Sequence, residues 1–450
     1  MRRLSDCRVI YPVPCKQHIL NTRRMKLKTK KSTLKGQVSI PGSKSHTIRA
    51  VAIASLAEGQ SRLCQPLISS DTLSATDCWR ALGAEIDTSH PNQWVITGTG
   101  GRIENQNQII DVGNSGTTLR LGLGSAALGH PDGAVTFTGD HQIQTRLLND
   151  LIGSLNDLGA NIRSLKNNGC APVMVSGRLK GGRTSIACFT SQYLSSLLLA
   201  CPLADDDTEI EVTLLNEPDY VQMTLDWLDK QQIDYKNNNF KTVYIRGGQR
   251  YTAFDERICA DFSSATFFLC AGALCGQDVL IQGLDFGDSQ PDKAVADYLR
   301  AMGADIRQEE SGIRVRQSAL KGIEIDMNRT PDALPAIAVT AAFAEGTTRL
   351  VNVPQARRKE TDRIACMAAE LTKIGACIEQ LPDGLVVHGG ETLTGGLVCG
   401  HADHRIVMAL AVAGLALDEP LEIDTAEAMN VTFPGFVDLM KTLNAKLNLQ

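Results

Sequence analysis

The chain has 450 residues, of which 43% are hydrophobic, 21% charged and 5% aromatic, with a formal net charge of −5. This length exceeds one ordinary hydrophobic core and predicts two or three domains. The mildly acidic balance gives no electrostatic reason to expect a nucleic acid or an anionic membrane as partner. The longest apolar run, residues 406–417, is shorter than the roughly 18 to 20 residues that cross a bilayer.

The cysteines are spread singly from Cys7 to Cys399, with no C-x-x-C pair and no histidine at metal-ligand spacing. The pattern predicts reduced thiols in a cytosolic protein and neither a disulfide framework nor a zinc site.

Residues 1–24 are basic, with Asp6 as their one acid, and lack the continuous apolar core of a secretory signal. They are also short and poor in serine for a transit peptide, which is the alternative interpretation. The segment is predicted to be a disordered extension or the product of an upstream start codon, with Met25 as the natural beginning.

A strand-like run at residues 37–40 leads into Pro-Gly-Ser-Lys-Ser at residues 41–45. A nucleotide-phosphate loop needs glycine directly before the lysine, and serine stands there, which argues against an NTPase. Lys44 remains as a point charge for a phosphate or a carboxylate. Arg49 lies four residues after Ser45 and precedes an uncharged run, where a buried charge needs a partner.

A phrase of the form Leu-Gly-Ala-x-Ile recurs about every 70 residues, in complete or degenerate form. Each phrase ends an amphipathic helix, such as the one expected at residues 147–158, with a left-handed cap, and a strand begins at once. The sequence therefore predicts six repeated units, each with a helix followed by a strand. The cap positions are Gly83, Gly159, Gln232, Gly303, Gly375 and Asn444.

A second marker has the same period: a small polar or charged cluster directly before an apolar run. The runs, such as residues 194–204 and 333–344, are apolar nearly all round, which predicts buried helices. Their N-termini would bring partial positive charge and free N–H groups to one region. The clusters are Lys44-Ser45, Asn114 to Thr117, Thr190 to Gln192, Asp261 to Ser264, Pro331-Asp332 and Asp403 to Arg405.

Ordinary N-capping is the simpler interpretation of any single cluster, including the one that holds Asp332. Capping does not explain the cations, because a lysine or arginine opposes the helix dipole there by about 0.3–1 kcal/mol. Lys44, Arg405 and the basic run 357–359 therefore indicate a negatively charged ligand. The segment 357–363, Arg-Arg-Lys-Glu-Thr-Asp-Arg, is the densest charge cluster, and a solvated surface helix is the alternative interpretation of it.

Four motifs carry a family resemblance: Pro-Gly-Ser-Lys-Ser, Asn-Ser-Gly-Thr-Thr-Leu-Arg, Arg-x-Lys-Glu-Thr-Asp-Arg and Asp-His-Arg. With them, the chain from about residue 27 to its end resembles the 5-enolpyruvylshikimate-3-phosphate synthase family. The resemblance implies an α/β fold of two inverted α/β barrels, each of three βαβαββ-type units. It implies a first domain of residues 25–43 plus 259–450, a second of residues 44–258, and an active site in the cleft between them.

The resemblance implies transfer of the enolpyruvyl group of phosphoenolpyruvate to the 5-hydroxyl of shikimate 3-phosphate, with release of phosphate. This reaction lies in the shikimate pathway to chorismate and the aromatic amino acids. The same resemblance implies a cytoplasmic monomer, a glyphosate target, and no need for a metal or another cofactor. Both substrates carry a phosphate and a carboxylate, which accounts for the cations at the helix starts.

Site residues are also implied by the resemblance. It assigns addition and elimination through a tetrahedral ketal phosphate, in which Asp332, alone or together with Lys359, accepts the 5-hydroxyl proton and Glu360 protonates the methylene carbon. The catalytic set is Asp332, Glu360, Lys44 and Lys359. The implied shikimate 3-phosphate ligands are Lys44, Ser45, Arg49, Thr190, Ser191, Gln192, Asp332, Gln355 and Lys359. The implied phosphoenolpyruvate ligands are Lys44, Gly116, Arg146, Gln192, Arg363 and Arg405, with Asn114 and Arg120 close by.

Two positions depart from the family pattern: Val431 stands where lysine is common, and Glu217 where serine is common. Two other functions stay open. The sister enzyme that acts on UDP-N-acetylglucosamine usually has a reactive cysteine in the loop matching residues 139–149, and this chain has none there. A non-catalytic protein that binds anionic metabolites could keep the cations and lose the carboxylates, whereas Asp332 and Glu360 are both present.

Overall fold

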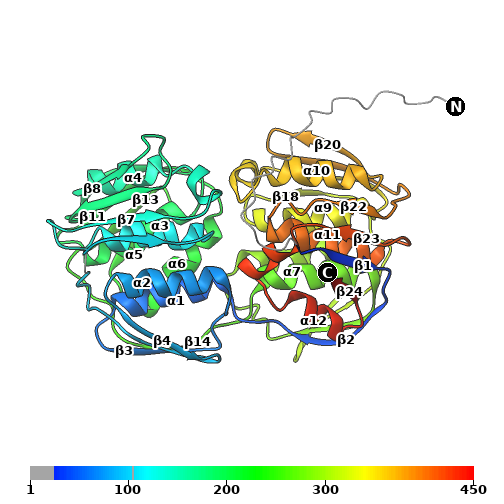
Figure 1. Ribbon diagram of the computed structural model, residues 1–450, viewed down its shortest axis with the longest axis horizontal. Helices are drawn as coiled ribbons and strands as arrows, with labels where there is room; N and C mark the ends of the chain where they lie inside the picture. Colours follow the sequence, from blue (N-terminus) through cyan, green and yellow to red (C-terminus); the bar gives the residue numbers. More distant parts are fainter. Residues whose placement is uncertain (1–24, 104–105) are drawn as a thin grey trace.

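The computed structural model describes residues 25–103 and 106–450, which form two halves lying side by side (Figure 1). The left half of Figure 1 holds strands β3 to β14 with helices α1 to α6. The right half holds β1, β2 and β15 to β24 with helices α7 to α12. Expectations about residues 1–24 lie outside the described residues.

Three four-stranded sheets make up the left half, each with one parallel and two antiparallel pairs. In sheet order they are β14 (Asp255–Arg257), β3 (Gln60–Cys64), β5 (Gln93–Thr97), β4 (Glu85–His90); β6 (Gln106–Asp111), β7 (Ala134–Thr138), β9 (Val173–Gly177), β8 (Ala160–Ser164); and β10 (Gly182–Cys188), β11 (Thr208–Leu215), β13 (Thr242–Ile245), β12 (Tyr235–Asn238).

The right half repeats this pattern in three further sheets. In sheet order they are β16 (Asp305–Glu309), β17 (Gly312–Arg316), β15 (Gly276–Gln282), β2 (Leu34–Ser39); β18 (Glu324–Asp326), β19 (Gly346–Val351), β21 (Gly384–Gly389), β20 (Cys377–Leu381); and β22 (Gly396–Val398), β23 (Leu421–Ile423), β1 (Leu27–Lys30), β24 (Lys446–Leu449).

Two kinds of helix alternate along the chain, as the repeat predicts. The odd-numbered helices are buried along nearly their whole length, and the even-numbered ones bury one face. In chain order they are α1 (Lys44–Leu56), α2 (Ser70–Ala81), α3 (Gly116–Ala126), α4 (Asn149–Asp157), α5 (Gln192–Ala200), α6 (Pro218–Lys230), α7 (Phe262–Cys275), α8 (Ala294–Ala301), α9 (Leu334–Ala342), α10 (Arg363–Lys373), α11 (His404–Ala416) and α12 (Phe436–Thr442).

The six cap positions predicted from the recurring phrase all have the left-handed conformation, with φ between 56° at Gln232 and 107° at Gly83. The predicted six-unit α/β architecture is therefore confirmed. One hydrophobic core joins residues 27–40 to residues 260–447, and a second lies within residues 48–258.

The chain passes between the halves twice, and the two passages pair with each other. Gly42 and Ala260 form an antiparallel bridge, the Ser43 amide donates to the Cys259 carbonyl at 2.8 Å, and the Asp261 amide donates to the Pro41 carbonyl at 3.0 Å. The motif at residues 41–45 therefore begins at the junction of the halves.

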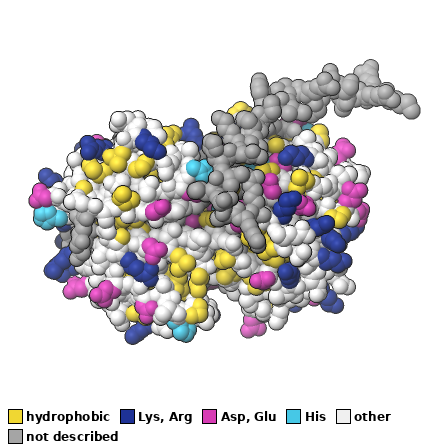
Figure 2. All heavy atoms as spheres, in the orientation of Figure 1, with side chains coloured by type: hydrophobic (Ala, Val, Ile, Leu, Met, Phe, Trp, Pro, Cys, Tyr) yellow, Lys and Arg dark blue, Asp and Glu magenta, His cyan; other side chains and the backbone are white. Residues whose placement is uncertain are grey.

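Acidic and basic side chains are interspersed over the face in Figure 2, and no large area carries one sign of charge. No disulfide joins two cysteines within residues 25–103 and 106–450. Within residues 25–103 and 106–450, no helix has the length and apolar character needed to cross a membrane.

Candidate active site

The starts of the buried helices carry the predicted polar clusters. Ser43, Ser115 and Asp403 cap α1, α3 and α11, because each side chain accepts a backbone N–H of the first turn. Capping is therefore the correct interpretation for these three residues. Asp332 differs, since it caps no helix and its carboxylate is bound by arginines instead.

Arg363, the first residue of α10, is the centre of the charged cluster and is only 1% exposed. Its Nε donates to Asp403 Oδ2 at 2.9 Å and its Nη1 to Asp332 Oδ1 at 2.8 Å, while its Nη2 donates to Glu360. Although burial opposes its charge, these carboxylates raise the pKa of Arg363 further above its ordinary value. One guanidinium thus fixes three carboxylates, two of which are the predicted catalytic pair.

Asp332 is also contacted by the other cations of the right half. Arg405 Nη2 lies 3.1 Å from Asp332 Oδ2 and donates to Ser263 Oγ at the start of α7, while Lys359 Nζ lies 3.7 Å from Asp332 Oδ1. Burial raises the pKa of Asp332, but the attraction of Arg405 and Lys359 outweighs it and holds that pKa well below its usual value. Asp332 is therefore ionised.

Glu360 joins the two halves. Besides its bond to Arg363, its Oε1 lies 3.2 Å from Nη2 of Arg146, which belongs to the left half. Burial alone raises the pKa of Glu360, but the attraction of Arg363 and Arg146 is stronger and holds the pKa well below its usual value. The cations therefore decide the charge of Glu360, a balance that the sequence left open.

Gly116, at the start of α3, lies next to the guanidinium groups of two arginines. A Cβ at this position would lie 2.4 Å from Nη1 of Arg146 and 2.7 Å from Nη1 of Arg120. Arg120 donates to Gln192 Oε1 at 2.7 Å, which brings the start of α5 into the cluster. Among the described residues, Nε of both arginines is buried without a hydrogen-bond partner, so these two N–H groups are available to an anionic ligand, whereas Nη2 of Arg146 is already ion-paired with Glu360.

Lys44 contacts Asp71 of α2 at 3.1 Å, and Asp71 was not predicted from the sequence. Burial raises the pKa of Asp71 against the attraction of Lys44. A carboxylate in the first turn of a helix is so common that the sequence offered no signal for this role.

Thr190 and Ser191 contact Glu217, and Gln192 also donates to Thr117. Glu217 accepts from Lys359 of the other half as well. Thr190 and Ser191 are thus linked to Lys359 through Glu217, the residue that departs from the family pattern.

Two predicted ligands, Arg49 and Gln355, make their contacts with protein groups outside the ion cluster. Arg49 is 2% exposed, and it donates to the Ser45 and Tyr220 carbonyls at 3.0 Å and to Thr224 Oγ1 at 2.9 Å. Burial lowers the pKa of Arg49 to about 10. Gln355 donates to the Asn328 carbonyl at 3.0 Å, while its Oε1 has no partner among the described residues.

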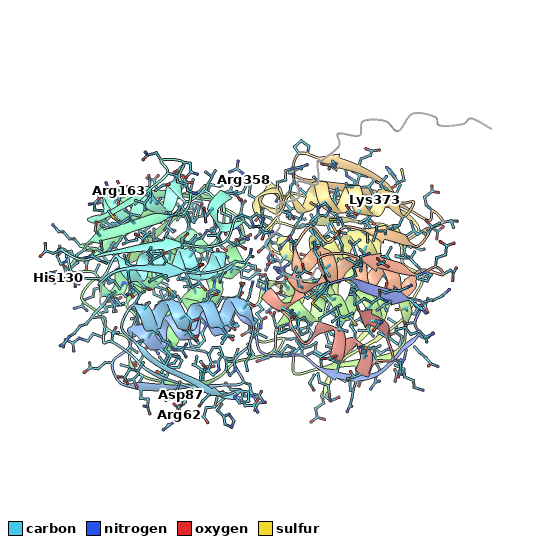
Figure 3. The ribbon with its side chains drawn as sticks, viewed as in Figure 1. Arg62, Asp87, His130, Arg163, Arg358 and Lys373 are labelled. Carbon is cyan, nitrogen blue, oxygen red and sulfur yellow. The ribbon has the colours of Figure 1, made fainter. Side chains whose placement is uncertain are left out.

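The segment 357–363 is not a solvated surface helix, so that alternative is wrong. A 3-10 turn over Pro354–Arg358 is followed by irregular backbone before α10 begins at Arg363. Arg358 lies at the boundary of the halves (Figure 3), and its guanidinium stacks 4.2 Å from the ring centroid of Phe189.

One group of described residues has the composition of a metal site: His46, Cys259 and Asp288, beside the passages between the halves. Trp227 Nε1 donates to His46 Nδ1, which places the proton of a neutral ring on Nε2, facing Asp288 Oδ1 at 3.1 Å. Burial raises the pKa of the Cys259 thiol, which opposes the thiolate that a metal needs. The hydrogen bonds therefore fit a thiol and an imidazole N–H that donate to the Asp288 carboxylate better than they fit a metal.

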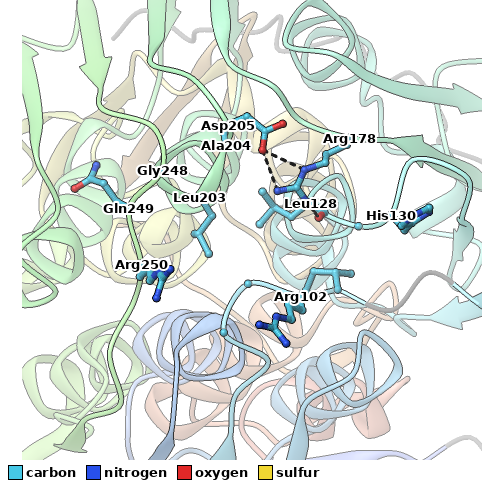
Figure 4. Close-up of a pocket in the computed structure, with 14 residues that line it drawn as sticks. Arg102, Leu128, His130, Arg178, Leu203, Ala204, Asp205, Gly248, Gln249 and Arg250 are labelled. Atoms are coloured by element: carbon cyan, nitrogen blue, oxygen red, sulfur yellow. Dashed lines mark hydrogen bonds and ion pairs between the residues drawn. The ribbon is translucent and has the colours of Figure 1, made fainter.

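A cavity of about 530 Å³ lies at the opposite ends of the left-half helices (Figure 4). Arg102, Arg178 and Arg250 line it, and Arg178 pairs with Asp205 at 3.0 Å. None of the predicted site residues lines this cavity.

The fold and the charged cluster define a class of protein: an α/β protein of two three-unit halves, with buried arginines, lysines and carboxylates gathered between them. A family model described as EPSP synthase (3-phosphoshikimate 1-carboxyvinyltransferase) matches residues 28–440. The chain belongs to this family.

Relatives and solved structures agree with the family model. The chain is 51% identical to the 3-phosphoshikimate 1-carboxyvinyltransferase of Ruminiclostridium cellulolyticum, over 94% of this chain and 100% of the relative. It is 53% identical to that of Acetivibrio thermocellus, over 94% and 99%. A structure of EPSP synthase from Acinetobacter baumannii is similar with a TM-score of 0.80 and 26% identity, covering 95% of this chain and 100% of the other.

Proposed function

We propose that the chain uses the charged cluster between its halves for the reaction of its family. In this reaction the enolpyruvyl group of phosphoenolpyruvate is transferred to the 5-hydroxyl of shikimate 3-phosphate and phosphate is released. The observation that carries the proposal is the placement of Arg363, which holds Asp332 with one nitrogen and Glu360 with another. A base and an acid are thereby fixed within a group of cations that suit anionic substrates.

The cations divide between the two substrates in this proposal. Guanidinium groups bind carboxylates and phosphates through paired hydrogen bonds, so arginines suit phosphoenolpyruvate. Nε of Arg146 has no hydrogen-bond partner among the described residues, and Gly116 leaves the room that a side chain would fill. The phosphoenolpyruvate set is Lys44, Gly116, Arg146, Gln192, Arg363 and Arg405. The shikimate 3-phosphate set is Lys44, Ser45, Arg49, Thr190, Ser191, Gln192, Asp332, Gln355 and Lys359.

Proton transfer follows from how the substrates change the cluster. In the free chain the cations hold Asp332 and Glu360 ionised. Substrate anions compete for the same guanidinium groups, so the pKa of both carboxyls rises on binding, and Glu360 takes up a proton. In the addition step, the 5-hydroxyl oxygen bonds to C2 of phosphoenolpyruvate, its proton passes to Asp332, and Glu360 protonates C3.

Elimination reverses the role of the acid. Glu360 takes back a proton from C3, the double bond re-forms, and the C2–O bond to phosphate breaks. Asp332 returns its proton to the departing phosphate, so both carboxyls end as they began. Lys359, which lies beside Asp332, stabilises the negative charge that develops during transfer.

The experiment is to mix the chain with both substrates and measure free phosphate together with the mass of the product. Release is expected only when both substrates are present. Binding of both without release would favour a non-catalytic protein that binds anionic metabolites. Release with UDP-N-acetylglucosamine in place of shikimate 3-phosphate would favour the sister enzyme, for which the loop 139–149 lacks the cysteine.

The division into domains is part of the proposal. The two separate hydrophobic cores support a first domain of residues 25–43 plus 259–450 and a second of residues 44–258. The monomeric state and the cytoplasmic location stay predictions.

A further inference from the structure

Glu217 has an unusual place at the junction of the halves. It precedes α6 with a left-handed backbone, φ 59° and ψ 48°, which L side chains rarely adopt, and it is only 2% exposed. Its carboxylate does not cap α6. A rare backbone conformation at a buried charged residue indicates that its side chain makes an important contact outside the helix.

The carboxylate points to the start of α5 and to the other half. Its Oε2 accepts from the Ser191 amide at 3.2 Å, from Ser191 Oγ at 2.7 Å and from Thr190 Oγ1 at 3.4 Å. Its Oε1 accepts from Nζ of Lys359. Four donors from two halves of the protein thus converge on one carboxylate.

These four donors form the set that a phosphate group would use. They combine a backbone N–H, two hydroxyl groups and an ammonium group, and they bind any compact anion with several oxygens. A phosphate monoester carries a charge of about −1.5 to −2 at neutral pH, so it repels a carboxylate on the same donors. The phosphate and the Glu217 carboxylate therefore cannot occupy them together.

We infer that Glu217 occupies the phosphate subsite of the free chain and must leave it before shikimate 3-phosphate binds. This inference rests on the proposed function and names Glu217 as the residue that sets affinity for the phosphorylated substrate. Lys359 links the exchange to catalysis, because its Nζ is shared between Glu217 and Asp332 Oδ1, 3.7 Å away. When the carboxylate leaves, Lys359 turns its charge to the phosphate and to Asp332.

A purely structural role makes the opposite prediction. Glu217 also links the halves through its amide, which donates to Asn328 Oδ1 at 3.2 Å, and through its bond to Lys359. If those links were its purpose, removing the carboxylate would loosen the junction and weaken binding. The sign of the change in affinity therefore separates the two roles.

The test compares the native chain with Glu217→Gln and Glu217→Ser by calorimetric titration. The ligands are shikimate 3-phosphate, shikimate without its phosphate, and inorganic phosphate. Glu211→Gln is the matched control, because Glu211 is exposed on the preceding strand and its side chain forms no hydrogen bond or ion pair with another described residue. Thermal melts establish that each variant folds.

Both Glu217 variants are expected to bind shikimate 3-phosphate at least 10-fold tighter than the native chain, and shikimate within 2-fold. Glu211→Gln is expected to match the native chain with every ligand. Equal or weaker binding of shikimate 3-phosphate by both variants overturns the inference, as does an equal gain with shikimate. Failure of both variants to fold assigns Glu217 a structural role and also overturns it.

The titration with inorganic phosphate tests this inference independently of the proposed function. Its tighter binding to the Glu217 variants supports the occupied subsite even if the native chain releases no phosphate from the two substrates. Conversely, normal turnover by the native chain with unchanged phosphate binding by the variants supports the function and contradicts the inference.

Discussion

Cationic side chains lie at both ends of the buried helices in the left half, and their partners differ between the two ends. At the C-terminal ends, Arg178 donates to the Leu128 carbonyl just past α3 and pairs with Asp205 (Figure 4). A cation at the C-terminal end of a helix interacts favourably with the helix dipole and stabilises the protein by about 0.3–1 kcal/mol. At the N-terminal ends, Lys44, Arg146 and Arg120 lie where the dipole opposes them, and buried carboxylates or amides hold them in place.

The difference teaches how to distinguish a structural cation from a functional one. A cation that complements the dipole needs no ligand to explain it, whereas one that opposes the dipole needs a stronger partner. The chain's own carboxylates supply that partner in the free protein, at a cost in desolvation that a well-packed apolar site would avoid. Such a site is costly for stability and suited to exchange with anionic substrates.

The largest expected effect is on turnover. Asp332→Asn and Glu360→Gln each remove a proton-transfer group, so turnover should fall about 100- to 10,000-fold. Asp205→Asn, at the opposite helix ends, should leave turnover unchanged. Steady-state phosphate release measures all three, and near-native turnover in either site variant would remove that residue from its role.

The next effect is on stability. Arg363→Met leaves buried carboxylates without their shared partner, so the free energy of unfolding should fall by about 3–5 kcal/mol. Arg178→Met breaks a partly exposed pair and should cost at most about 1 kcal/mol. Urea denaturation of both variants checks this, and equal losses would show that the two ends do not differ.

A smaller effect is expected at the glycine below the arginines. Gly116→Ala places a methyl group 2.4 Å from Arg146 Nη1, which must shift, so phosphoenolpyruvate and glyphosate should both bind about 10-fold more weakly. Gly153→Ala on α4 is the control, because a Cβ there meets nothing within 4 Å. Inhibition and KM measurements compare the two, and unchanged values for Gly116→Ala would contradict the proposed contact.

A further effect concerns pH and Asp292, which accepts from the Tyr220 hydroxyl at 2.6 Å. Burial raises the pKa of Asp292 to about 7, against the attraction of Arg405. The folded chain therefore holds this proton more tightly than the unfolded chain, and this group lowers stability as the pH rises from about 4 to 7.

The Asp292→Asn variant has no carboxyl group at this position that could ionise as the pH rises. Its stability relative to the native chain should therefore increase over the same pH interval, at up to about 1.4 kcal/mol per pH unit, and level off above pH 7. Urea denaturation from pH 4 to pH 8 measures the difference between the two chains. A difference that does not change with pH would contradict the raised pKa.

Much of the fold follows from local patterns in the sequence. The left-handed caps depend on short-range sterics, and the buried helices on an apolar surface all round, so both were predicted from the residues. The pairing of β1 with β23 and of β14 with β3 was not predicted, because the paired strands are distant in the chain. Such pairing depends on tertiary contacts that no local window contains.

Local sequence patterns predicted the site to a similar extent. Cations that oppose helix dipoles were visible in the sequence at Lys44 and Arg405, and the family resemblance added Arg146 and Glu360. The carboxylates that hold them were missed or unexplained, since Asp71 resembles an ordinary first-turn acid and Glu217 contacts Lys359 142 residues away. Only the folded chain shows that the cations have partners before any substrate binds.

One measurement tests the central claim most directly: kcat/KM for phosphoenolpyruvate in Arg146→Met against Arg178→Met, with shikimate 3-phosphate saturating. The account predicts a fall of at least about 100-fold for Arg146→Met, since a desolvated charged contact is lost, and a change below about 2-fold for Arg178→Met. Equal effects at the two positions, or no effect at Arg146, would contradict it.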